Sequence, residues 1–243
     1  MSHIAYAPLT RPTLPGPTIT PRTLSNTGLL AYFDMKLKAI TVAAEAGDEA
    51  EVTRLLAEGE NPNGGIDDNW PPLVFAAKNG HATVVDSLLA AGAKTNKADL
   101  NGLTPLATAA DNGHVMVVDK LLGAGADPDL APDRDGRCGS TWADPDRDTP
   151  LVFAASRGHE TVVDRLIEAG ADTNLATRKG FTPLSVAAAK GHWKVIDRLL
   201  ESGADSNLET VQDRTPLIRA VDNEYADIVQ VSPVSIIRKT NGA

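Results

Sequence analysis

Pairs of apolar residues recur along the chain at the spacing of one helix face. Val84, Val85, Leu88 and Leu89 show the pattern, with two valines at i and i+1 and two leucines at i+4 and i+5. Such spacing is typical of the apolar stripe of an amphipathic helix. Because similar segments follow one another along most of the chain, the pattern predicts a series of short helices. Each of them needs a neighbour to cover its apolar side.

A shorter helix is expected before each of these stripes. It begins at a proline, whose missing N–H is harmless in a first turn, and it contains paired alanines that let neighbouring helices approach closely. An x-Gly-His turn ends it, since glycine adopts positive φ, and a Gly-Ala pair ends the second helix. The motif prolines lie 33, 45, 33 and 33 residues apart, at Pro72, Pro105, Pro150, Pro183 and Pro216.

This period resembles the ankyrin repeat family. The Thr-Pro-Leu, Ala-Ala, Gly-His, Leu-Leu and Gly-Ala-Asp motifs all match, over about residues 36–231. The resemblance implies an all-α fold, an ankyrin-type α-solenoid of about six helix–turn–helix units with β-turn loops and a concave binding face. The family's histidine after Thr-Pro-Leu is absent, which removes a polar tie between units and is expected to make the stack somewhat less rigid. Its replacements are Val74, Ala107, Val152, Ser185 and Ile218.

The two ends of the array are degenerate. In the last copy Ser232-Pro233 stands where Leu-Leu belongs, and proline there breaks a helix. We expect residues 1–35 to be a Pro- and Thr-rich leader, either disordered or a partial cap, whose P-x-x-P element is most simply part of a linker. Residues 232–243 are expected to form an irregular tail. The tail is either a natural cap or the premature end of a longer array.

An insertion of 12 residues, near 132–143, lengthens one spacing from 33 to 45. Its alternating aspartates suggest a calcium loop, but an EF-hand requires an acid at Ala131 and a glutamate at Trp142. Cys138 is a candidate reactive thiol beside arginines, although no neighbouring histidine completes a nucleophilic pair. The favoured interpretation is a solvated or partner-contacting loop, with Trp142 as an aromatic anchor.

Charge and composition exclude several functions. The chain has 23 Lys and Arg against 32 Asp and Glu, a formal net charge of -9. Such an acidic chain binds nucleic acid or anionic membranes poorly, so we expect neither as a direct partner. No apolar run reaches the length of a membrane span, and the first residues lack the apolar segment of a signal peptide. The single cysteine excludes an internal disulfide and fits a reducing compartment, although it is also compatible with secretion. We expect a cytoplasmic or nuclear protein, and a monomer.

The residues that carry enzyme chemistry do not form a recognisable group. A metal site needs several ligands that converge on one ion, whereas the motif histidines lie one unit apart. We expect each of them to begin a second helix and to tie the turn by hydrogen bonding. Paired carboxylates, a glycine-rich phosphate loop and a Ser–His–Asp order are not recognisable, so no catalytic residue, cofactor or metal is predicted. The four histidines are His81, His114, His159 and His192.

Candidate binding residues follow from the turn of each unit. The residue before Thr-Pro projects at the turn tip, so Trp70, Leu103 and Phe181 are expected to be exposed apolar anchors in a row. Trp193 is aromatic, whereas the equivalent residues of other units are not. It either covers the adjacent unit or marks a second patch. The positions after Ala-Ala are expected to face the groove and vary within a regular frame, as recognition requires, unless they are merely solvated. They include Lys78, Asn79, Asp111, Asn112, Arg157 and Lys190.

The resemblance implies a protein–protein interaction module, an adaptor or regulator that binds another protein in its concave face and turn tips. Two alternatives stay open. One is a transcription co-regulator that acts through a DNA-binding partner, which cell imaging would distinguish. The other is an enzyme or enzyme subunit with its site in the groove or in the 132–143 insertion, which deletion of that insertion would reveal.

Overall fold

A computed structural model describes residues 39–65, 70–99, 101–131 and 148–208. Within these ranges the regular elements are helices and no strand occurs, which confirms the all-α prediction. A helical stretch over residues 39–46 precedes nine helices. In chain order these are α2 (Glu49–Ala57), α3 (Pro72–Lys78), α4 (Ala82–Ala90), α5 (Pro105–Asp111), α6 (Val115–Gly123), α7 (Pro150–Arg157), α8 (Glu160–Glu168), α9 (Pro183–Lys190) and α10 (Trp193–Glu201).

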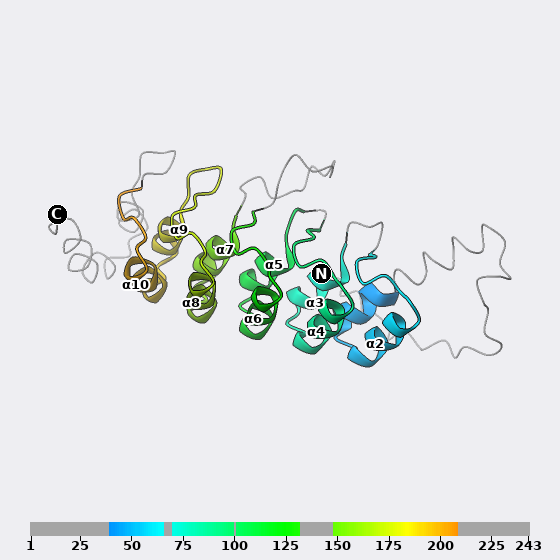
Figure 1. The fold of residues 1–243 in the computed structure, drawn as a ribbon. Helices are drawn as coiled ribbons and strands as arrows, with labels where there is room; N and C mark the ends of the chain where they lie inside the picture. The colour runs from blue at the N-terminus through cyan, green and yellow to red at the C-terminus, as the bar shows by residue number, and fades with distance from the viewer. Residues whose placement is uncertain (1–38, 66–69, 100, 132–147, 209–243) are drawn as a thin grey trace, which may run out of the picture.

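The helices form two layers along a single row (Figure 1). In the first layer, which we call the inner helices, α3, α5, α7 and α9 pack one against the next. In the second layer, the outer helices α2, α4, α6, α8 and α10 do the same. The loop between α8 and α9, which is described throughout, projects from the inner side of the row (Figure 1). This is the solenoid of helix pairs that the 33-residue period predicts.

The inner helices begin where the Thr-Pro motif predicts. The threonine hydroxyl oxygen accepts a hydrogen bond from the backbone N–H three residues on, at 3.1 Å in α5, 3.3 Å in α7 and 3.1 Å in α9. The proline after it occupies the first turn of each helix. α3 lacks this cap because Pro71 stands in place of the threonine. Capping of this kind satisfies N–H groups that a helix leaves unpaired.

The core lies between the two layers. The paired alanines of the inner helices are almost completely buried, as Ala109 and Ala110 illustrate at 0% exposure. In α4, α6 and α8 both valines and the first leucine of the stripe are buried, whereas Leu89 and Leu122 are only partly buried. Small residues on the inner helices thus allow close packing, while the outer helices supply most of the apolar bulk.

The motif histidines bind the preceding unit, not their own turn as expected. In each, Nε2 donates to a backbone carbonyl at the end of the previous inner helix, over 2.9 to 3.1 Å. The glycine of the preceding turn makes room for the ring, because a Cβ on Gly113 would lie 2.8 Å from the His159 ring. Each histidine does begin its outer helix, but its side chain makes no capping bond there. The hydrogen bond therefore joins units, a role that a single unit's sequence does not reveal.

We expect His159→Ala to lower the free energy of unfolding by about 0.5 to 1.5 kcal/mol, because the bond to the carbonyl of Asp111 is lost. Urea unfolding followed by circular dichroism measures the change. Thr161→Ala, at an exposed site on the same helix, is the matched control and should shift stability by less than about 0.5 kcal/mol. Equal effects of the two substitutions would contradict the inter-unit role.

The stack continues without a break across the insertion. α7 packs on α5 and α8 on α6, as in the neighbouring units. The backbone N–H of Asp172 donates to Oδ1 of Asp129 over 2.9 Å, and Asp205 and Asn174 form the same bond one unit later at 2.7 Å. Residues 132–147, which include the insertion near 132–143, lie outside the described residues. The 12 added residues therefore leave the helix packing around them unchanged.

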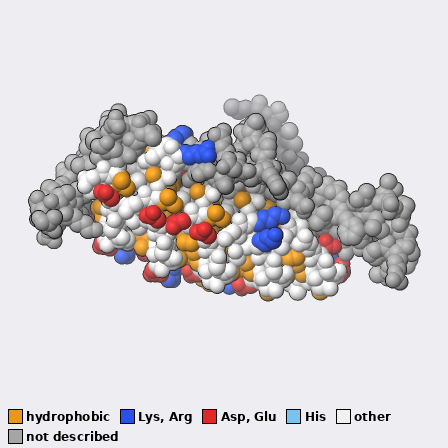
Figure 2. Space-filling view, turned by 45° about the horizontal axis from the view of Figure 1, so that its top comes forward, with side chains coloured by type: hydrophobic (Ala, Val, Ile, Leu, Met, Phe, Trp, Pro, Cys, Tyr) orange, Lys and Arg blue, Asp and Glu red, His pale blue; other side chains and the backbone are white. Residues whose placement is uncertain are grey.

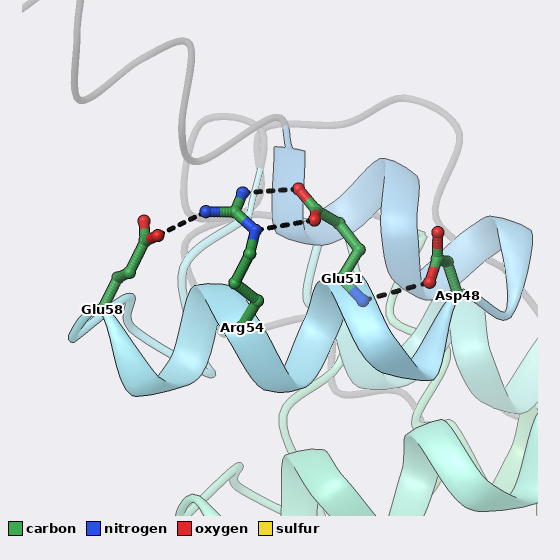
Figure 3. Close-up of polar contacts among 4 residues, drawn as sticks. All are labelled: Asp48, Glu51, Arg54 and Glu58. Atoms are coloured by element: carbon green, nitrogen blue, oxygen red, sulfur yellow. Dashed lines mark hydrogen bonds and ion pairs between the residues drawn. The ribbon is translucent and has the colours of Figure 1, made fainter. Parts of the chain in front are cut away.

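The outer helices carry ion pairs that link consecutive units. Lys120 pairs with Asp86 at 2.6 Å, and the equivalent pair of Arg165 with Asp119 spans 3.2 Å. In α2 the equivalent arginine, Arg54, is instead held within its own helix by Glu51 and Glu58 (Figure 3). The link between units is missing between α2 and α4, because Thr53 occupies the acidic position of α2 and Ser87 the basic position of α4. All of these pairs are largely exposed, so each contributes little to stability.

Candidate partner-binding surface

The turn residues predicted as exposed anchors are half-buried. Trp70, Leu103 and Phe181 all have intermediate exposure, so the expectation of a fully exposed row was wrong. The reason is that each turn folds back on its own unit. The Trp70 and Phe75 rings lie 5.8 Å apart, centre to centre, at an angle of 42°. Leu103 is fixed by Asp99, whose Oδ1 accepts from its backbone N–H at 2.9 Å.

The structure brings several predicted residues together around one hollow on the inner face. The hollow has a volume of about 230 Å³ and lies between the units of α3 and α5, with one wall from α7. Trp70 and Leu103 from the turns line it together with predicted groove residues from the inner helices. Sequence reasoning did not identify Phe75, Phe153 or Asp99. The residues that line the hollow are Trp70, Val74, Phe75, Lys78, Asp99, Asn101, Leu103, Ala107, Thr108, Asp111, Asn112 and Phe153.

The hollow exists because one inner-helix position changes size between units. The residue just before the paired alanines is Phe75 in α3, Thr108 in α5, Phe153 in α7 and Val186 in α9. Thr108 is small and lies between two phenylalanines. Its hydroxyl donates to the carbonyl of Thr104 over 2.8 Å, so its polar atom is satisfied within α5. The small side chain of Thr108 therefore leaves space at the floor of the hollow, and its hydroxyl needs no hydrogen bond from a ligand.

The carboxylates at the hollow are engaged within the chain. Asp99 is 5% exposed and accepts the backbone N–H groups of Asn101 and Leu103, both at 2.9 Å. Burial raises the pKa of Asp99, while these hydrogen bonds and the charge of Lys78 act in the opposite direction. The second carboxylate, Asp111, pairs with Nε of Arg157 at 2.7 Å. The negative charges that border the hollow are thus balanced by neighbouring protein groups.

The buried Asp99 carboxyl should make stability depend on pH. Its folded-state pKa is raised above the ordinary value of 3.8, so the folded protein binds this proton more readily than the unfolded chain does. The contribution of this group therefore rises as pH falls from neutral through its folded-state pKa toward 3.8. Urea unfolding across this range should show that the free energy of unfolding of the native chain gains a contribution as pH falls. The Asp99→Asn variant should lack this contribution. Parallel stability curves for the two proteins would contradict this expectation.

Other predicted groove residues have structural partners or lie elsewhere. The side-chain amide of Asn79 donates to the carbonyl of Glu45 over 3.0 Å, and that of Asn112 donates within its own helix. Lys190 is exposed on α9, and it does not line the hollow; nor does Phe181. Trp142, the predicted anchor of the insertion, lies outside the described residues, as does Cys138.

A second aromatic feature lies on the outer layer. Trp193 begins α10 and is 53% exposed, with Nζ of Lys194 5.6 Å from its ring centre. Figure 2 shows one face of the array, where hydrophobic side chains are interspersed with a row of acidic ones and Lys and Arg are scattered around them. Among the described residues no group of three or more His, Cys, Asp or Glu is placed to hold a metal. Nor is any described helix long and apolar enough to cross a membrane.

Comparison with known proteins agrees with the fold. No curated protein matches the sequence at a significant level. A family model described as ankyrin repeats (3 copies) matches residues 40–131 and 151–231, which together are more than half of the chain. The gap between the two matches contains the insertion. Repeats of this family typically serve as protein-interaction modules without catalytic activity, and this chain belongs to the ankyrin repeat family.

Proposed function

We propose that this protein is an adaptor or regulator that binds a partner protein with its inner face. The observation that carries the proposal is the hollow, where Trp70 and Leu103 from the turns meet Lys78, Asp111 and Asn112 from the inner helices. Partly buried aromatic and apolar groups with polar groups around them are typical of interface hot spots. The partner is a protein, and the chain does not itself bind nucleic acid or a membrane. The chain acts as a monomer in the cytoplasm or nucleus.

The outer layer supports this choice of face. Apart from Arg54, the basic side chains of the outer helices are already engaged in exposed ion pairs between consecutive units, such as Lys120 with Asp86. The inner face instead has an indented, mostly apolar lining. Concave apolar sites with a few placed polar groups are the usual location of ligand recognition.

Affinity capture from the source cell with the full chain, followed by titration of each purified candidate, tests the proposal. A captured protein that binds directly, and whose binding protects the hollow from hydrogen exchange, supports it. Direct binding that protects only the outer helices would contradict the assigned face. A DNA-binding protein as the direct partner would favour the role of transcription co-regulator.

A further inference from the structure

We infer that the hollow between α3, α5 and α7 takes one uncharged aromatic side chain of the partner protein. The inference rests on the proposed function and specifies the chemistry of its contact. Three properties of the hollow carry it: its size, the aromatic groups of its wall, and the balanced charges around it.

The size of the hollow fits a single ring. Its volume is about 230 Å³. An apolar cavity of about 150 Å³ in another protein is large enough to bind benzene. One aromatic side chain therefore fits, with room left for the atoms that join it to the partner's backbone.

The wall provides three aromatic side chains from two units of the stack. Trp70 and Phe75 come from one unit, and Phe153 comes from a unit two steps further along. Aromatic rings whose centres lie about 4.5 to 7 Å apart attract one another, and this attraction adds to the free energy gained by burying their surface. Trp70 and Phe75 already form one such pair at 5.8 Å. A ring inserted above Thr108 lies within reach of additional pairs.

The charges around the hollow favour an uncharged group over an ionic one. Asp99 is occupied by backbone N–H groups and lies in the field of Lys78, and Asp111 is held by Arg157. A basic side chain that enters the hollow loses water and finds both carboxylates already engaged, whereas an acidic one meets the charge of Lys78 only together with the negative charge of Asp99. An uncharged ring does not incur this loss.

The hollow depends on the small residue that one unit has at this position. Thr108 has Phe75 and Phe153 at the equivalent positions of the flanking units, so a phenylalanine here would fill the space. Thr108→Phe therefore blocks the hollow with a residue that the same fold already accommodates twice. Val186→Phe makes the equivalent enlargement in α9, away from the hollow, and serves as the matched control.

Titration of the ¹⁵N-labelled full chain with N-acetyl-phenylalanine amide tests the inference. The indole N–H resonance of Trp70 and the backbone resonance of Leu103 should shift, and N-acetyl-lysine amide should leave them unchanged. Thr108→Phe should abolish the shifts and Val186→Phe should retain them, with circular dichroism confirming that both fold. If Thr108→Phe does not fold, Thr108→Leu replaces it, with a reduced shift expected. Equal shifts with both amides, or no shift with either, would overturn the inference.

Peptides selected from a random library against the full chain separate this inference from the proposed function. Selected peptides should share an aromatic residue, and Thr108→Phe should weaken their binding about tenfold or more. Peptides that bind tightly without an aromatic residue, and equally to Thr108→Phe, would overturn the inference and leave the proposed function standing. A library that yields no binder, with the amide still shifting Trp70, would count against the proposed function alone.

Discussion

Leu121→Ala lowers the free energy of unfolding by about 2 to 5 kcal/mol, because it opens a cavity in the middle of the stack. Leu121 is 0% exposed and lies on α6, which packs on α5 within its unit and on α4 and α8 in the units beside it. In a repeat array each unit is stabilised mainly by contacts with its neighbours. A defect at a central unit therefore weakens two interfaces together. Urea unfolding followed by circular dichroism measures the loss.

Met116→Ala is the matched control for this substitution. Met116 lies on the same helix but is 64% exposed, so removing its side chain should change stability by less than about 0.5 kcal/mol. A loss of similar size for Met116→Ala and Leu121→Ala would contradict the packing of α6 between its neighbours.

Replacing Trp70, Leu103 and Phe181 together by alanine should weaken binding of the partner about a hundredfold or more. Two of these side chains line the hollow, and the third occupies the equivalent turn of the α9 unit. All three are half-buried, and Trp70 and Leu103 form part of the wall of the hollow, so the substitutions remove part of a formed site. Helical content should stay intact, since the paired alanines and the valine–leucine stripes are untouched. Isothermal titration with the purified partner measures the change.

The control for this prediction is a pair of substitutions on the outer layer. Trp193→Ala and Met116→Ala together remove two large exposed side chains, at 53% and 64% exposure. They should leave the affinity for the partner nearly unchanged. If the outer pair of substitutions lowers the affinity more than the turn substitutions do, the partner binds the outer layer, and the assigned inner face is contradicted.

The fold was predictable because its signals are local and recur. Each proline, each alanine pair and each Val-Val-x-x-Leu-Leu stripe specifies a helix, and the 33-residue period requires that these helices stack. Thr104, Thr149 and Thr182 cap their helices as the motif predicts. The structure adds that the packing continues across the insertion, which the period alone did not establish.

The site was only partly predictable because it forms between units. Trp70 and Leu103 were correctly singled out as turn residues, but their exposure was overestimated. Asp99 holds the turn of Leu103, and Thr177 does the same for Phe181 by accepting its backbone N–H at 3.1 Å. A short polar residue four positions before the turn residue is the sequence signal that identifies such a folded-back turn.

The phenylalanines of the hollow were missed for a related reason. Within one unit, Phe75 and Phe153 have the same appearance as core residues beside paired alanines. Only the comparison of equivalent positions, with Thr108 between them, indicates that a space is left. The inter-unit bond of His159 was likewise invisible, because the acceptor lies 48 residues earlier in the chain.

A crystal structure of the full chain bound to its partner tests the central claim most directly. We predict that α7 packs on α5 across the insertion and that a side chain of the partner occupies the hollow bordered by Trp70, Phe75 and Phe153. A partner bound only to the outer helices, or α5 and α7 held apart, would contradict this account.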